Sequence, residues 1–112
     1  MKLDILAIGA HPDDVELSCS GTIAKEIANG KQVAILDLTQ GELGTRGSAE
    51  IRANEAGKAA KILGVTARYN LNFPDGFFEN NKENQLKLVK DVSLRLEILF
   101  LCFLLAQGFL KY

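Results

Sequence analysis

The chain has 112 residues, of which 47% are hydrophobic and 24% are charged, and its formal net charge is −1. This length fits one folded domain with one core, so we predict a single domain over residues 1–112. A net charge near zero with scattered basic residues excludes the electrostatic surface typical of nucleic-acid or anionic-membrane binding, and neither partner is expected.

The two cysteines, Cys19 and Cys102, lie far apart and lack metal-binding spacing. We therefore expect two free thiols, which is typical of proteins in a reducing compartment. An acidic residue, Asp4, lies near the start of the chain, and this pattern does not resemble a secretory signal. Together these features predict a cytoplasmic protein.

Three apolar runs predict strands. Residues 3–9 and 32–39 are almost continuously apolar, which is typical of strands buried on both faces of a parallel sheet. Residues 67–73 alternate between apolar and polar side chains, so this third strand is expected to have a more solvated face.

Between these runs, three- and four-residue spacing of apolar side chains predicts helices. The first begins at Asp14 and is stopped by Asn29-Gly30; the second covers residues 49–63 with Ser48 as N-cap; the third covers about residues 80–92. The side chains expected to face the core are Leu17, Ile23, Ala24, Ile27 and Ala28 in the first helix, Ile51, Ala56, Ala59, Ala60, Ile62 and Leu63 in the second, and Leu86, Val89 and Val92 in the third.

The last part of the chain, residues 92–112, is an atypical apolar tail. Residues 98–106 are uninterrupted apolar side chains, a run shorter than the ~20 residues that a spanning helix requires. We expect a buried strand or core helix, with a membrane-associated tail as the alternative. Residues 98–106 are predicted either to dock as a fourth strand or to drive self-association into a homo-oligomer.

Alternating strands and helices predict an α/β fold, a three-layer Rossmann-like parallel sheet with helices on both faces. Ligands of such sheets bind outside the carboxyl ends of the strands. Polar clusters follow each predicted strand there, at residues 11–14, 41–42 and 74–76. We therefore expect these three clusters to lie along one edge of the sheet.

The first cluster has the chemistry of a metal-dependent hydrolase. His11 and Asp14 offer a ring nitrogen and a carboxylate oxygen three residues apart, and Asp13 between them is placed to take a proton from a metal-bound water. The alternative is a solvated acidic helix N-terminus preceded by a capping histidine. Ligand type alone allows zinc or iron(II).

The same residues resemble a known family. Residues 10–16 read AHPDDVE, which is similar to the A-H-P-D-D-x-E signature of the LmbE-like (PIG-L) zinc-dependent N-deacetylases. Residues 38–47 (LTQGELGTRG), 52–56 (RANEA) and 74–76 (PDG) also resemble that family. The resemblance covers roughly residues 1–89 and is nearest to the branch that deacetylates N-acetylglucosaminyl-malate during bacillithiol synthesis.

This resemblance implies an enzyme that hydrolyses an N-acetyl group, a C–N bond other than a peptide bond, from a small N-acetylated amino-sugar conjugate. It implies one Zn²⁺ per chain held by His11 and Asp14, with Asp13 as the general base. It also implies that Glu42, Arg52 and Asp75 line the sugar-binding pocket.

The chain departs from the family pattern in one respect that bears on activity. The family supplies a third zinc ligand from a later histidine, whereas this chain has a single histidine. Zinc is then expected to bind weakly unless Glu16, Asp37, Glu42 or another chain substitutes. Two interpretations follow: an N-deacetylase, or a catalytically incomplete α/β fragment with residual metal or sugar binding. The loss of pattern near Asp91 predicts a truncated or frame-shifted domain.

Overall fold

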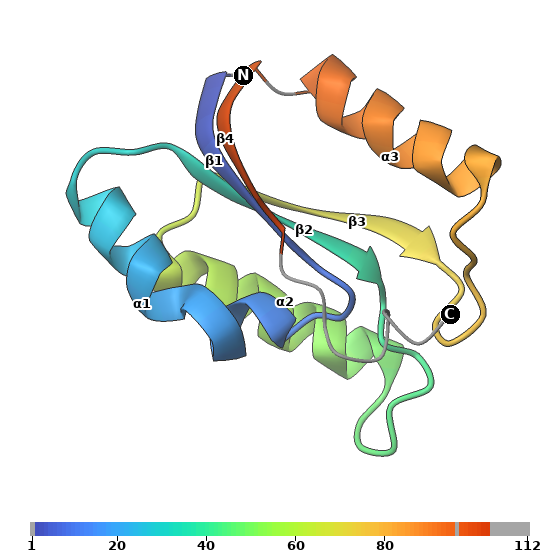
Figure 1. The fold of residues 1–112 in the computed structure, drawn as a ribbon. Helices are drawn as coiled ribbons and strands as arrows, with labels where there is room; N and C mark the ends of the chain where they lie inside the picture. Colours follow the sequence, from blue (N-terminus) through green and yellow to red (C-terminus); the bar gives the residue numbers. More distant parts are fainter. Residues whose placement is uncertain (1, 96, 104–112) are drawn as a thin grey trace.

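The computed structural model describes residues 2–95 and 97–103, which form four strands and three helices in alternation (Figure 1). The elements are β1 (Lys2–Gly9), α1 (Asp14–Ala28), β2 (Val33–Thr39), α2 (Ala49–Leu63), β3 (Ala67–Phe73), α3 (Lys82–Arg95) and β4 (Glu97–Phe103). All strand pairs are parallel, in the order β3-β2-β1-β4. The predicted α/β class and the predicted positions of the first three strands and of the helices are confirmed.

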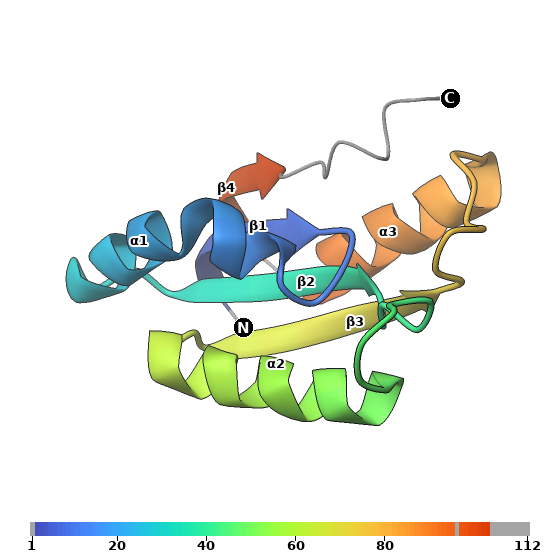
Figure 2. The same cartoon turned by 90° about the horizontal axis from the view of Figure 1, so that it is seen from below.

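The helices cover both faces of the sheet, with α1 and α2 on one face and α3 on the other (Figure 2). Two apolar clusters correspond to these two interfaces. One cluster includes Leu6 and Leu36 of the sheet and receives Leu88 from α3. The other includes Val15 of α1 and Ile35 of β2. The predicted three-layer arrangement is therefore confirmed.

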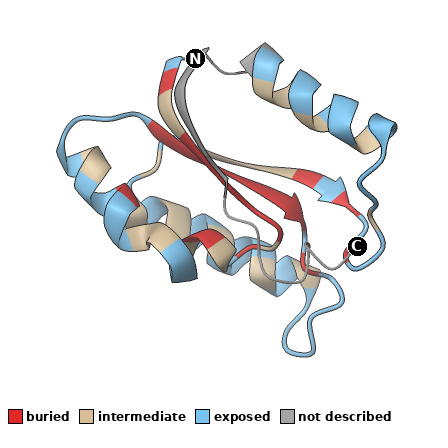
Figure 3. Cartoon of the chain, viewed as in Figure 1, coloured by how far each residue is buried: buried red, intermediate tan, exposed pale blue. Residues whose placement is uncertain are grey.

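Strand β2 lies at the centre of this core and is buried at all seven of its positions (Figure 3). The order of the strands on either side of β2 determines where a ligand crevice can form. The chain runs from β1 outward to β3 and then returns to place β4 on the other side of β1. The carboxyl end of β1 is therefore at a topological switch point, where ligand crevices form in open parallel sheets.

The expectation for the tail is met in part by strand β4. Residues 97–103 pair in parallel with β1, which confirms docking as a fourth strand over residues 98–103. The remainder of the predicted segment, residues 104–106, lies outside the described residues. None of the helices in the described part of the chain is long and apolar enough to cross a membrane.

Several predicted core positions are wrong. Leu17 of α1, Ile51 and Ile62 of α2, and Leu86 and Val89 of α3 are all exposed. Each helix carries apolar residues on more than one face, and only one face contacts the sheet. In α1 the sheet-facing residues are Val15, Cys19, Ile23 and Ile27, at four-residue steps; in α3 they are Leu88 and Val92. Ala24 and Ala28 are also exposed, whereas Ala56, Ala59, Ala60 and Leu63 are half-buried.

Candidate functional site at the carboxyl edge of the sheet

The turn between β1 and α1 is fixed to the end of β2. The carbonyl oxygen of Ala10 accepts hydrogen bonds from the backbone N–H and the hydroxyl of Thr39, at 3.0 and 2.9 Å. A Cβ at Gly9 would lie 3.1 Å from Asp14 Cβ, so the turn folds back tightly on the start of the helix. These constraints place the side chains of the turn beyond the strand end.

Asp13 has an unusual backbone conformation within this turn, with φ 145° and ψ −25°. A non-glycine residue in such a region costs about 1–3 kcal/mol and persists where the surroundings impose it, often at active sites. Its carboxylate is half-exposed and is held by Arg52, with 3.1 Å between Nη2 and Oδ2. The residue predicted as the general base is therefore strained, accessible and oriented.

His11 contacts a carboxylate on each side of its ring. Its Nδ1 lies 3.4 Å from Asp14 Oδ2, and its Nε2 lies 2.8 Å from Asp75 Oδ1. The backbone N–H of His11 also donates to Asp14 Oδ2 at 2.9 Å. The histidine side chain is 37% exposed, whereas that of Asp75 is 8% exposed, so the ring is partly accessible and its carboxylate partner is not.

Asp75 joins the three strand-end clusters. It follows β3, and its Oδ2 accepts from the backbone N–H of Leu43 at 3.0 Å. Its own backbone N–H donates to Glu42 Oε1 at 2.8 Å. Through these bonds the loops after β1, β2 and β3 meet, which confirms the predicted convergence at one edge of the sheet.

Arg52 connects the second helix to the same edge. Its Nη1 donates to the carbonyl of Gly41 at 3.1 Å, while Nη2 binds Asp13. The glycine loop makes room for this guanidinium, because a Cβ at Gly41 or Gly44 would lie 2.8 or 2.5 Å from Nη1. The glycines of the loop therefore have a direct role in positioning Arg52 against Asp13.

A second ionic cluster, centred on Arg68, was not predicted. Alternation along the third strand indicated a solvated side chain, but the side chain of Arg68 is 9% exposed and donates to both oxygens of Asp37, at 2.7 and 3.0 Å, and to Glu16. Burial raises the pKa of the Asp37 carboxyl above its ordinary value, and the hydrogen bonds from Arg68 oppose this shift. Burial lowers the pKa of Arg68, but the bonds and charges of Asp37 and Glu16 outweigh it and raise that pKa overall.

This cluster corrects the list of substitute metal ligands. Asp37 and Glu16 are both occupied by Arg68, and Glu42 accepts from Asp75. The sequence signal that could have revealed the cluster is an aspartate inside an otherwise apolar buried strand, since such a charge requires a partner.

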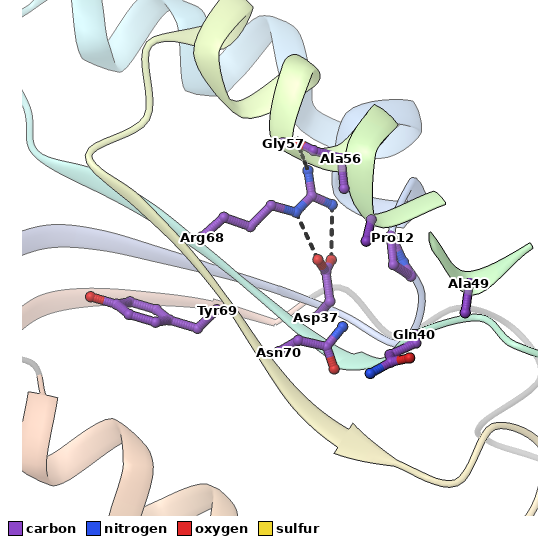
Figure 4. Close-up of a pocket in the computed structure, with 10 residues that line it drawn as sticks. Pro12, Asp37, Gln40, Ala49, Ala56, Gly57, Arg68, Tyr69 and Asn70 are labelled. Carbon is purple, nitrogen blue, oxygen red and sulfur yellow. Dashed lines mark hydrogen bonds and ion pairs between the residues drawn. The ribbon is translucent and has the colours of Figure 1, made fainter. Parts of the chain in front are cut away.

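A cavity of about 210 Å³ lies between α2 and the strands β2 and β3, with Arg68 and Asp37 in its wall (Figure 4). Small side chains of α2 leave this space open. Its lining residues are Pro12, Asp37, Gln40, Ala49, Ala53, Ala56, Gly57, Arg68, Tyr69 and Asn70. None of the six predicted site residues is among them, but Pro12, between His11 and Asp13, lines the cavity, so it adjoins the turn that carries the His11 cluster.

The donors at the carboxyl edge fit part of a zinc centre. Two ligands about 2.0–2.1 Å from a tetrahedral zinc ion lie about 3.3 Å apart, and His11 Nδ1 and Asp14 Oδ2 are separated by 3.4 Å. Catalytic zinc sites use three protein ligands. Among the residues that the structure describes, no group of three histidine, cysteine, aspartate or glutamate side chains could hold a metal ion.

Comparison with known proteins identifies the family. Residues 6–104 match the PIG-L family, described as GlcNAc-PI de-N-acetylase. The chain belongs to this family. The uncharacterized deacetylase YaiS of Escherichia coli is 38% identical over 88 residues, which are 79% of this chain and 47% of that protein.

Two solved structures agree with the fold. The conserved protein TT1542 from Thermus thermophilus has a TM-score of 0.78 and 45% identity, over 86% of this chain and 44% of its own. The N,N'-diacetylchitobiose deacetylase from Pyrococcus horikoshii has a TM-score of 0.73 and 34% identity, over 80% of this chain and 36% of its own. This PIG-L chain thus spans less than half the length of each of these relatives.

Proposed function

We propose that the protein is a metal-dependent hydrolase that removes the N-acetyl group from an N-acetylglucosaminide, releasing acetate and a free amine. Membership of the PIG-L family supports this reaction class. The observation that carries the proposal is the geometry of Asp13, a strained and half-exposed carboxylate beside His11 and Asp14 at the switch point of the sheet. As the particular substrate we propose N-acetylglucosaminyl-malate, in the cytoplasm.

In the proposed reaction, Asp13 accepts a proton from a water molecule as the water oxygen attacks the acetyl carbonyl carbon. The C–N bond then breaks, the amine nitrogen takes the proton held by Asp13, and acetic acid leaves and loses its remaining proton to solvent as acetate. Arg52 keeps the Asp13 carboxylate oriented during both proton transfers through the Nη2–Oδ2 contact. General acid–base catalysis of this kind contributes about 10²–10⁴-fold to the rate.

A zinc ion bound by His11 and Asp14 would polarise the carbonyl oxygen and lower the pKa of the attacking water. Glu42, Arg52 and Asp75 stay the predicted sugar contacts. Arg52 is the one cation among these, and its guanidinium lies between the glycine loop and Asp13.

A second candidate is a catalytically incomplete protein with residual metal or sugar binding. The specific observation that favours it is the donor count, since the described residues supply two donors of a three-ligand centre. This candidate predicts weak zinc binding without hydrolysis.

Acetate release by the purified full chain, assayed with N-acetylglucosaminyl-malate and added zinc, separates the two candidates. The deacetylase proposal predicts acetate above the protein-free control together with about one zinc ion per chain. Zinc below stoichiometry and no acetate from any N-acetylglucosaminide tested would eliminate it in favour of the second candidate. Light scattering on the same sample tests self-association, the alternative predicted for residues 98–106 beside docking as a fourth strand.

A further inference from the structure

Both side-chain oxygens of Asp75 are engaged within the protein. Its side chain is 8% exposed, its Oδ1 contacts His11 Nε2 at 2.8 Å, and its Oδ2 accepts from the N–H of Leu43 at 3.0 Å. Its backbone N–H is also used, by Glu42. Three polar atoms of Asp75, the two side-chain oxygens and the backbone N–H, therefore bind neighbouring residues of the protein.

The contact with His11 has a defined direction. A carboxylate accepts hydrogen bonds and does not donate them, so the proton of the neutral imidazole must be on Nε2. The acceptance of the Leu43 N–H by the other oxygen agrees with a carboxylate at this position. With the proton on Nε2, the lone pair of the ring is on Nδ1.

That lone pair lies beside Asp14. His11 Nδ1 and Asp14 Oδ2 are 3.4 Å apart, and Asp14 Oδ2 is itself fixed by the backbone N–H of His11 at 2.9 Å. Two electron-pair donors, one nitrogen and one oxygen, are thereby presented together. An unconstrained imidazole would distribute its proton over both nitrogens and present this pair only part of the time.

We propose that Asp75 is a positioning residue, which holds His11 in the Nε2–H tautomer so that Nδ1 and Asp14 Oδ2 form one preorganised donor pair. The inference rests on the proposed function for its catalytic meaning, but its geometry is independent of activity. It assigns Asp75 a role through His11 in addition to the sugar contact that the family resemblance implies. Carboxylates that orient a metal-binding histidine in this way commonly change metal affinity when mutated.

The single histidine of the chain makes the test direct. Ring-¹⁵N-labelled histidine in the full chain gives one pair of nitrogen signals, and long-range ¹H–¹⁵N correlation shows which nitrogen carries the proton. The spectrum is recorded at several pH values, and the nitrogen shifts themselves identify the spectra that report the neutral ring. The proposal predicts the Nε2–H tautomer in about tenfold or greater excess, as expected for a hydrogen bond to a charged group.

Two variants complete the design. In Asp75→Asn a single amide oxygen cannot accept from both His11 and Leu43, so the two nitrogen shifts are expected to move towards each other as both tautomers become populated. Glu55→Gln, which neutralises an exposed carboxylate of α2, should leave the spectrum unchanged. Circular dichroism confirms that each variant is folded.

The wild-type spectrum is decisive even if Asp75→Asn does not fold. An Nδ1–H tautomer or an even mixture in the wild-type chain overturns the proposal, as do unchanged nitrogen shifts in a folded Asp75→Asn variant. Failure of the deacetylase proposal would give a different result: no acetate would be released, but the Nε2–H tautomer of His11 would still be observed.

Discussion

Replacing Arg68 with methionine removes the largely buried cation that neutralises two carboxylates, and the consequence for stability can be worked out from the contacts. The side chain of Asp37 is 3% exposed and that of Glu16 is 22% exposed. Glu16 can turn towards water, whereas Asp37 cannot. Leaving one carboxylate buried without its partner costs about 3–5 kcal/mol, a large part of the about 5–15 kcal/mol that stabilises a typical domain.

The assay is urea unfolding at neutral pH, followed by circular dichroism. Arg46→Met is the matched control, because Arg46 is exposed and its replacement should change the free energy of unfolding by no more than about 0.5 kcal/mol. In the double variant Arg68→Met/Asp37→Leu the orphaned charge is also removed, and replacing both members of a buried pair by apolar groups is often nearly neutral. The double variant is therefore expected to be more stable than Arg68→Met alone.

Two results would refute this reasoning. One is a loss of less than about 1 kcal/mol in Arg68→Met, which would mean that Asp37 finds water or another partner. The other is a double variant no more stable than the single one. If Arg68→Met does not fold at all, the double variant still gives the comparison, because recovery of folding is then the predicted outcome.

Three further predictions concern glycines and a titration. Gly44→Ala would place a Cβ 2.5 Å from Arg52 Nη1, so a crystal structure should show the guanidinium displaced from Asp13, with a stability change below about 1 kcal/mol; an intact ion pair would contradict this. Gly57→Ala meets no atom within 4 Å and should raise the free energy of unfolding by about 0.5–1 kcal/mol in thermal or urea melts, since Gly disfavours helix; a loss would contradict it. Burial raises the pKa of Asp37 above 3.8, so its carboxyl ¹³C shift should titrate above that value. Its contribution to stability should fall as pH rises from 3.8 through the folded pKa, because the folded state binds the proton more tightly there.

Much of the backbone arrangement could be predicted from local pattern. Helix α2 begins and ends where expected, because Ser48 caps it by accepting from the Ile51 N–H and Gly64 ends it in a left-handed conformation. Strand β3 also matches the predicted range. These signals come from residues that are adjacent in sequence, so they can be recognised without knowledge of the tertiary structure.

Helix burial and the Arg68 cluster could not be predicted in the same way. Leu17 is as apolar as Val15, but two residues along a helix point to nearly opposite sides, and only the packed sheet selects the buried one. Arg68 and Glu16 are 52 residues apart, and periodicity alone gives no sign of their contact. The His11–Asp75 bond likewise forms because three strand ends meet. The topology predicts that the loops after these strands lie near each other, but not which side chains bond.

The rate of acetate release by the wild-type chain relative to Asp13→Asn tests the central claim most directly. Asparagine keeps the shape of the side chain and one acceptor for Arg52 but cannot take the proton from water. With an N-acetylglucosaminide and zinc, we predict a fall of about 10²–10⁴-fold in Asp13→Asn and no change in Glu55→Gln. Equal rates in the wild-type chain and Asp13→Asn would contradict the assignment of Asp13 as the base, and with it the proposed site.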